Sequence, residues 1–315
     1  MPKFATLALK AAMKALKPQM GKIDLEHQRA LQDKAVQLCK PGHPTRYLPV
    51  EVAGMKAAWE GPSRGAPEDR AVLYCHGGAY LYGSLEYARV IAAKIALAAG
   101  LNVMAIEYPL APEHPYPQAL EAAVAAYRHL LELGFRPGHI ALAGESAGGN
   151  MVLALLIRLK ALGIPLPAAA VTLSPWCDLG GRGISYRARA EQDATLDPDS
   201  ITDAARMYAA GASMDDPLVS PAFGDFTGCP PVLIQCGSDE ILYSDCLNLY
   251  QRMREQGVDV VMQTWNELWH VFQCYPVAEA RVAVAEIGSF LRRQLNLPAR
   301  RSKAAAHPFR VMQRT

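Results

Sequence analysis

The chain contains, at positions 144–149, the sequence Gly144-Glu145-Ser146-Ala147-Gly148-Gly149. It stands between an apolar run at residues 139–143 and a helical pattern that begins at residue 150. A Gly-x-Ser-x-Gly sequence in this setting is typical of a sharp turn that joins a strand to a helix. Glycine is needed on both sides of the serine, because a side chain there would collide with neighbouring backbone. We therefore expect a strand, a tight turn and a helix.

The turn predicts a nucleophile. It holds the hydroxyl of Ser146 above the sheet, and it places the amide of Ala147 at a helix N-terminus, where that amide can donate to an oxyanion. A turn that is rich in glycine and serine but has no chemistry is the alternative, because such short patterns also recur by accident.

Apolar runs and helical patterns alternate on both sides of this turn. We expect strands at residues 46–52, 55–59, 71–75, 103–108, 139–143, 168–173, 231–236 and 258–264. We expect helices at residues 91–99, 118–133, 150–162, 200–208, 244–256 and 278–294. This alternation predicts an α/β fold with a mostly parallel eight-stranded sheet and helices on both faces.

Three segments depart from the alternation. Residues 1–45 are predicted to be helical and charged, and residues 299–315 to be a loosely held tail, so that residues 46–298 form the main domain. The polar stretch at residues 180–211 is expected to be an insertion over the edge of the sheet. The first helix is amphipathic, and we expect its apolar stripe to pack on the protein rather than on lipid headgroups; that stripe comprises Phe4, Leu7, Ala11 and Ala15.

Composition and net charge limit the classes of partner and site that the protein can have. The 315 residues, 51% of them hydrophobic, can bury one large core. With 32 basic and 30 acidic residues the net charge is only +2, which favours a small neutral partner over nucleic acid or an anionic membrane. We expect no signal peptide and no membrane-spanning segment. The seven cysteines are scattered without a Cys-x-x-Cys pair, which predicts buried thiols in a reducing, cytoplasmic compartment rather than a metal site.

A serine nucleophile needs a base, and His270 is the best placed of the eight histidines. It follows the last predicted strand, from which a loop residue can reach a serine at the edge of the sheet. A third group must then orient the imidazole. Asp239 and Glu240 both follow the strand at residues 231–236, and their side chains should point in different directions. From the residues alone either carboxylate can be that acid, whereas Asp245 is more simply a group that stabilises the next helix N-terminus.

A second glycine-rich segment, His76-Gly77-Gly78-Ala79, follows the strand at residues 71–75. Two glycines allow the backbone to approach a substrate and to aim its amides inward. We expect the amides of Gly77 and Gly78, with that of Ala147, to stabilise a tetrahedral oxyanion. A phosphate-binding loop is the alternative, but no lysine follows and the full phosphate-loop spacing is absent.

Four sequence motifs together resemble the bacterial hormone-sensitive lipase family (family IV) of α/β-hydrolase carboxylesterases, over about residues 70–291. They begin at His76, Tyr108, Gly144 and Ser174, and read His-Gly-Gly-Ala, Tyr-Pro-Leu-Ala-Pro-Glu-His-Pro-Tyr-Pro, Gly-Glu-Ser-Ala-Gly-Gly-Asn and Ser-Pro-Trp-Cys-Asp-Leu. The resemblance implies an α/β-hydrolase fold in which residues 1–45 and about 180–211 form a helical cap. It also implies a homodimer.

The resemblance assigns roles as well. It implies that Ser146 is the nucleophile, that His270 is the base, that Gly77 and Gly78 are oxyanion donors, and that no cofactor or metal is used. Counted from the start of the strand at residues 231–236, the acid of the family falls on Glu240, so the resemblance favours Glu240 over Asp239. The sequence departs from the family pattern at two positions, and neither change is expected to abolish the activity. Alanine stands at position 79 in place of glycine, and Glu145 replaces the more usual Asp or Thr.

These features predict hydrolysis of a small-molecule ester through an acyl-enzyme. The segment at residues 180–211 is polar, which favours short to medium acyl esters or small lactones over long chains; its charged residues include Arg182, Arg187, Arg189, Glu191 and Asp193. The alternatives are a non-catalytic protein that binds a small ligand on the same fold, and an amidase or long-chain lipase with the same triad.

Overall fold

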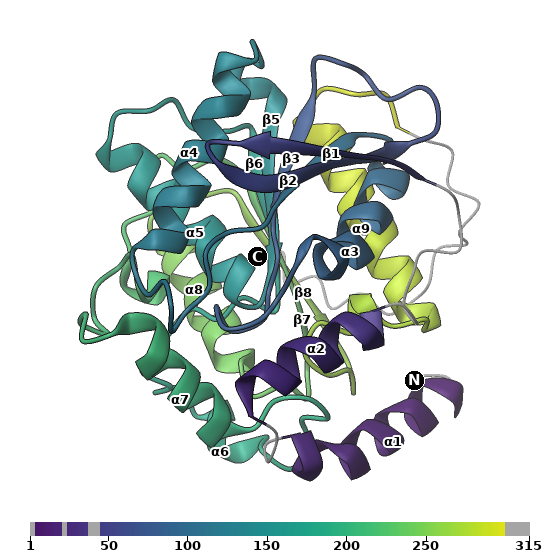
Figure 1. Cartoon of the computed structure of the whole chain (residues 1–315), viewed down its shortest axis with the longest axis vertical. Helices are drawn as coiled ribbons and strands as arrows, with labels where there is room; N and C mark the ends of the chain where they lie inside the picture. Colours follow the sequence, from purple (N-terminus) through teal and green to yellow (C-terminus); the bar gives the residue numbers. More distant parts are fainter. Residues whose placement is uncertain (1–3, 21–23, 37–44, 300–315) are drawn as a thin grey trace.

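The computed structural model describes residues 4–20, 24–36 and 45–299 (Figure 1). In this part of the chain eight strands form one sheet, in the order β1-β2-β4-β3-β5-β6-β7-β8. The strands are β1 (Thr45–Val52), β2 (Met55–Pro62), β3 (Ala71–Cys75), β4 (Asn102–Ile106), β5 (Ile140–Glu145), β6 (Ala169–Leu173), β7 (Val232–Gly237) and β8 (Val260–Trp265). From β4 to β8 all neighbours pair in parallel, whereas β2 is antiparallel to both β1 and β4. The predicted eight-stranded, mostly parallel sheet is confirmed.

Helices connect the strands and cover both faces of the sheet. Those described are α1 (Phe4–Met20), α2 (Leu25–Val36), α3 (Leu85–Ala99), α4 (Gln118–Glu132), α5 (Ala147–Ala161), α6 (Ser185–Ala188), α7 (Pro198–Ala209), α8 (Tyr243–Glu255) and α9 (Ala278–Gln294). The largest difference from the predicted bounds is at α3, which begins six residues earlier than expected. Its start is fixed by Ser84, whose hydroxyl accepts from the amide of Tyr87 and so caps the helix.

The core lies on both faces of the sheet, because successive side chains of a strand point to opposite sides. In β3, Leu73 and Cys75 belong to the same buried cluster as side chains of α4, α5 and α8, while Val72 and Tyr74 belong to a second cluster with side chains of α3 and α9. Strands that are buried on both faces read as continuous apolar runs, which is why the sequence located them well.

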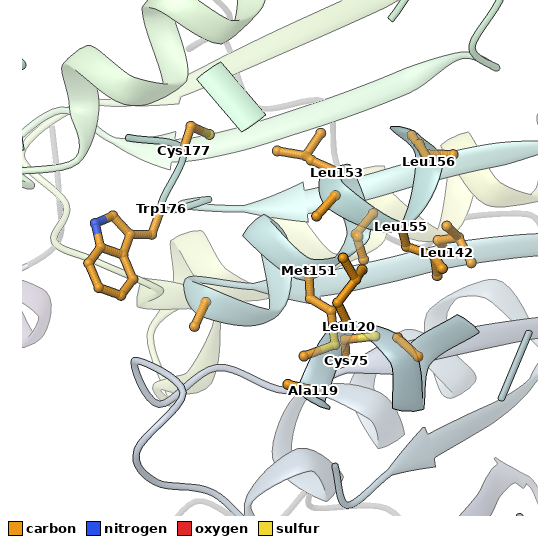
Figure 2. Close-up of a cluster of buried hydrophobic side chains, with 14 of the residues drawn as sticks. Cys75, Ala119, Leu120, Leu142, Met151, Leu153, Leu155, Leu156, Trp176 and Cys177 are labelled. Atoms are coloured by element: carbon orange, nitrogen blue, oxygen red, sulfur yellow. The ribbon is translucent and has the colours of Figure 1, made fainter. Parts of the chain in front are cut away.

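The helix that follows the Ser146 turn is anchored deeply in this core. Figure 2 shows side chains of α5, among them Met151 and Leu155, packed towards Leu142 of β5, Leu120 of α4 and Cys75 of β3. All five side chains are at most 1% exposed. Burial of one such leucine or methionine contributes about 1.5–3 kcal/mol to stability, so α5 gives the turn a rigid base.

Helix α1 does not pack as expected. Phe4 and Leu7 of the predicted stripe are 87% and 44% exposed, and Ala11 and Ala15 also face solvent, so that prediction was wrong. The face that packs on the protein instead repeats at helical spacing and comprises Thr6, Leu9, Lys10, Met13 and Lys17. It differs from the apolar stripe because the two lysines reach polar partners on the protein.

Helices α1, α2, α6 and α7 gather at the lower end of the molecule in Figure 1. This is the end at which the parallel strands finish, because Arg29 of α2 donates to the carbonyls of Leu81 and Ala111 in the loops after β3 and β4. In the described ranges no helix is long and apolar enough to cross a membrane. The predicted tail, apart from residue 299, lies outside the described residues.

Candidate active site

Ser146 lies in the turn between β5 and α5, with φ 56° and ψ −121°. This strained conformation is possible because the neighbouring glycines allow the backbone to cross closely. A Cβ atom added to Gly144 would lie 2.4 Å from the carbonyl oxygen of Gly148, and one added to Gly148 would lie 2.1 Å from that of Cys75. The turn therefore holds the Ser146 side chain above the sheet, as the spacing of the glycines indicates.

His270 lies beside this serine. It comes from the loop after β8, and its Nε2 atom is 2.9 Å from Ser146 Oγ. Only 7% of the histidine and 6% of the serine is exposed. Gly237 allows the approach of this loop, because a Cβ added there would lie 2.2 Å from the carbonyl oxygen of Leu268. The geometry suits transfer of the hydroxyl proton to the imidazole.

Glu240, and not Asp239, contacts the histidine. Its Oε2 atom is 2.9 Å from His270 Nδ1, while Oε1 accepts from the amide of Gly237 at 2.5 Å. Complete burial raises the pKa of Glu240, and the hydrogen bond from His270 opposes that rise. The carboxyl of Asp239 turns away and pairs with Lys10 of α1. The two adjacent acids thus point in different directions, as expected for neighbouring residues.

Ser174, whose role was not predicted from the sequence, links the loops that carry these two side chains. Its hydroxyl donates to Glu240 Oε1 at 2.9 Å and accepts from the amide of Val271 at 3.2 Å. Ser174 follows β6 in a left-handed conformation, with φ 46°. Its position as the first residue of a motif after a strand was the available signal.

The His76-Gly77-Gly78-Ala79 loop lies against the nucleophile, but one of its amides is already engaged. A Cβ added to Gly77 would lie 3.1 Å from that of Ser146. The amide of Gly77, which was expected to face a substrate, instead donates to Glu145 Oε1 at 2.6 Å. The structure differs from the prediction here because a buried carboxyl lies directly behind the loop.

Glu145 is the second residue near Ser146 whose importance was missed. It is 1% exposed, and its other oxygen accepts from the hydroxyl of Tyr74. Burial raises the pKa of Glu145 to about 8. A Gly-x-Ser-x-Gly motif gives no information on its second position, so only the contacts reveal that this side chain supports the glycine loop.

An aromatic cluster borders the same loop. The ring of Tyr80 stacks on that of Tyr208 in α7, with 3.6 Å between centroids, and its hydroxyl donates to Asn150 at 2.6 Å. His76 stacks on Tyr108, whose hydroxyl donates to the carbonyl of His76. His76 thereby has a structural role in the loop, and the loop is tied to the α7 segment.

Asp245 has a more extensive role than that of a group near a helix N-terminus. Although it lies in the first turn of α8, it is buried, and its Oδ2 atom accepts from the amides of Cys177 and Asp178. Burial raises the pKa of Asp245 to about 8. Within the described ranges, no group of three or more His, Cys, Asp or Glu side chains is arranged to hold a metal ion.

Comparisons with known proteins agree with this fold. A family model described as the alpha/beta hydrolase fold matches residues 72–274. The structure is similar to the crystal structure of an esterase from the bacterial hormone-sensitive lipase family, with a TM-score of 0.89 and 37% identity, over 94% of this chain and 100% of that chain. The chain belongs to the bacterial hormone-sensitive lipase family of α/β-hydrolases.

Two relatives within the hydrolases have names that describe an activity. The chain is 44% identical over 245 residues to an acetyl-hydrolase from Streptomyces hygroscopicus. The aligned residues cover 77% of this chain and 81% of that protein. It is 34% identical over 267 residues to an esterase from Acinetobacter venetianus. Here the aligned residues cover 83% of this chain and 88% of that protein.

Proposed function

We propose that this hydrolase is a serine carboxylesterase that cleaves small acyl esters through an acyl-enzyme on Ser146. The observation that carries the proposal is the continuous hydrogen-bonded chain from Ser146 Oγ through His270 to Glu240, with 2.9 Å at each step. A nucleophile, a base and a buried acid in this order form the Ser-His-acid arrangement that carries out acyl transfer by serine.

The reaction proceeds in two halves. As Ser146 Oγ attacks the ester carbonyl carbon, His270 Nε2 accepts the hydroxyl proton, and the carbonyl becomes an oxyanion. His270 then gives that proton to the alcohol oxygen, the ester bond breaks, and an acyl group is left on Ser146. Water repeats the sequence and releases the acid. Glu240 stays ionised and stabilises the imidazolium through Nδ1.

For the oxyanion we propose the amides of Gly78 and Ala147 as donors. Ala147 is the first residue of α5, so its amide has no acceptor within the helix. The amide of Gly77 is held by Glu145, and we therefore assign Gly77 a positioning role in the loop. Loss of one such donor typically raises the barrier by about 3 kcal/mol.

We propose that residues 1–45 and 180–211 form a cap over the acyl pocket, and that the preferred acyl chains are short to medium. Contacts of α2 with the loops after β3 and β4 and the stack of Tyr208 on Tyr80 support the cap. The similarity to an acetyl-hydrolase favours short acyl groups. The segment at residues 180–211 presents fewer charges to solvent than the sequence indicated, because Asp193 is buried.

Hydrolysis of p-nitrophenyl esters by the wild type and by Ser146→Ala tests this function. We expect the variant to keep its fold and to lose at least about 10³-fold in kcat, because the nucleophile is gone. An acyl series from acetate to palmitate, with a matched amide and a lactone, identifies the preferred substrate. Equal turnover by the two proteins would exclude the serine mechanism.

We also propose a cytoplasmic location and a homodimer. Buried thiols support a reducing compartment, since burial raises the pKa of Cys75, Cys177 and Cys246 and keeps them from reacting. The homodimer is supported by family resemblance alone. Cell fractionation and light scattering on the purified protein test the two proposals.

A further inference from the structure

We propose that α1 is a strap that sets the distance between the acid and the base, and that Lys10 is its key positioning residue. The proposal rests on the function assigned to Glu240 and His270 above. It joins two features that the catalytic chain leaves unused, namely the basic first helix and the second acid of the Asp239-Glu240 pair.

The Lys10 ammonium contacts both of the loops that carry these catalytic side chains. It pairs with the carboxylate of Asp239, the residue directly before Glu240, and it donates at 2.9 Å to the carbonyl of Glu267, three residues before His270. The side chains of Lys10 and Asp239 are only 13% and 23% exposed. An ion pair at this depth is screened less by salt than one on the open surface.

These contacts close a ring of hydrogen bonds. Ser238 Oγ donates to Asp239 Oδ1 at 2.8 Å and accepts from the amide of Glu267 at 2.8 Å. The carbonyl of Glu267 and the other oxygen of Asp239 both accept from Lys10. Glu267 is held there in a left-handed conformation, with φ 60°. The ammonium is the one member of the ring that comes from outside the two loops.

A second lysine of the same helix face reaches the other side of Glu240. Lys17 donates to the carbonyls of Ala190 and Asp193 at 2.9 and 3.0 Å. The buried carboxyl of Asp193 in turn accepts from the amide of Ile241 at 2.8 Å. The residues on both sides of Glu240 are therefore bound to α1, directly or through one further residue.

Apolar contacts of α1 fall on the loop that carries the base. Leu9 and Met13 share the inward face of α1 with the two lysines and pack on a cluster that includes Leu268 and Trp269. These residues flank His270 on its N-terminal side. Helix α1 thus packs on the loop that carries His270, and it forms an ion pair with the residue beside Glu240.

The strap acts behind the catalytic side chains, and this location predicts its kinetic effect. Loss of the ring allows the two loops to move relative to each other, and small displacements of catalytic groups lower the rate of the chemical step. Since Lys10 touches loop residues beside the acid and the base, substrate affinity should change little. We expect an effect on kcat and not on KM.

The test compares Lys10→Met with Lys10→Arg and with Lys14→Met, a control on the exposed side of the same helix. With a p-nitrophenyl ester we expect Lys10→Met to lower kcat about tenfold and to change KM less than twofold. Lys10→Arg keeps the positive charge and should recover most of kcat, and Lys14→Met should match the wild type. Asp239→Asn breaks the same pair from the other side, should give the same pattern, and serves if Lys10→Met does not fold.

The outcomes separate the strap from the function on which it rests. An active wild type that loses turnover in Ser146→Ala supports the esterase whatever the lysine variants do. If Lys10→Met or Asp239→Asn keeps the kcat of the wild type, or if the change appears in KM alone, the strap is wrong while the esterase stands. Equal losses in Lys10→Met and Lys14→Met would also overturn it, because they would reflect the stability of the helix.

Discussion

Glu240 and Asp239 are neighbours in sequence with opposite surroundings. Glu240 is fully buried between His270, Ser174 and the amide of Gly237, whereas Asp239 meets a lysine near the surface. An acid that orients an imidazole cannot be replaced by an amide without favouring the wrong tautomer of the ring.

We therefore predict that Glu240→Gln lowers kcat by about 10³–10⁴-fold, while Asp239→Asn lowers it about tenfold through the loss of the Lys10 pair. Steady-state kinetics at pH 7.5 on both variants, with circular dichroism as the control for folding, measure the difference. A severe loss in Asp239→Asn without one in Glu240→Gln would show that Asp239, and not Glu240, is the acid that orients His270.

Glu145 makes the rate depend on pH in a predictable direction. Because burial raises its pKa to about 8, the carboxyl is neutral at lower pH and becomes an anion above about pH 8. A negative charge behind the glycine loop opposes the oxyanion that the loop faces, so kcat/KM should fall on the alkaline side.

Glu145→Gln should remove that alkaline fall and keep activity at pH 7 within a few-fold, because the amide oxygen still accepts from Gly77. The pH profile of kcat/KM from 6 to 10 is the measurement. An alkaline limb that is identical in both proteins would show that another group controls it.

The residues of the site differ in how readily they could be predicted. Ser146 and His270 could be placed near each other because a strained turn demands a base and few histidines follow a strand. The acid remained a choice between neighbours until the resemblance favoured one. The engaged amide of Gly77 could not be foreseen, because it depends on where the Glu145 side chain points.

At the level of elements, the strand–turn–helix unit of β5 and α5 requires glycine at position 148, because there is no room for a side chain there. A Cβ at Gly148 would lie within 2.4 Å of the carbonyl oxygens of Cys75 and His76, and backbone atoms cannot move aside as a flexible side chain can. Gly138, in the turn before β5, has no atom within 4 Å of such a Cβ.

Gly148→Ala should therefore destabilise the protein by about 1–3 kcal/mol or more and lower the esterase activity, while Gly138→Ala should leave both unchanged. Thermal unfolding followed by circular dichroism compares the two variants with the wild type. A melting temperature for Gly148→Ala equal to that of Gly138→Ala would contradict the close approach.

Strands and the first helix show why prediction succeeded for some elements and failed for others. The runs that became β3, β5 and β6 are almost entirely apolar, and this pattern can be recognised without knowledge of which elements pack on the strand. The inward face of α1 is set by Lys10 and Lys17, whose partners lie more than 170 residues away. Hydrophobicity alone therefore selected the wrong face.

The stability of the whole molecule should also depend on pH through Asp245. Its pKa is about 8 in the folded protein and near 4 in an unfolded chain, so the folded state binds the proton more tightly between these values. The free energy of unfolding then falls as the pH rises from about 4 to 8, by at most about 1.4 kcal/mol per pH unit.

Asp245→Asn keeps one acceptor oxygen but does not titrate, so its free energy of unfolding should fall less over this range. Urea unfolding of both proteins at pH 5, 6.5 and 8 measures the difference, and other buried carboxyls contribute equally to both. A difference between the two proteins that is constant with pH would refute the assignment.

The attachment of α1 also bears on the order of events during synthesis. Lys10 is 229 positions from Asp239, and Thr6 is 273 positions from its partner Glu279. At 5–20 residues per second, the helix leaves the ribosome on the order of 10–50 s before these partners exist. During that time Leu9 and Met13 have nothing to cover them, and a chaperone can bind there. Full turnover should therefore appear only after the partners of α1 have been made and the helix has docked on them.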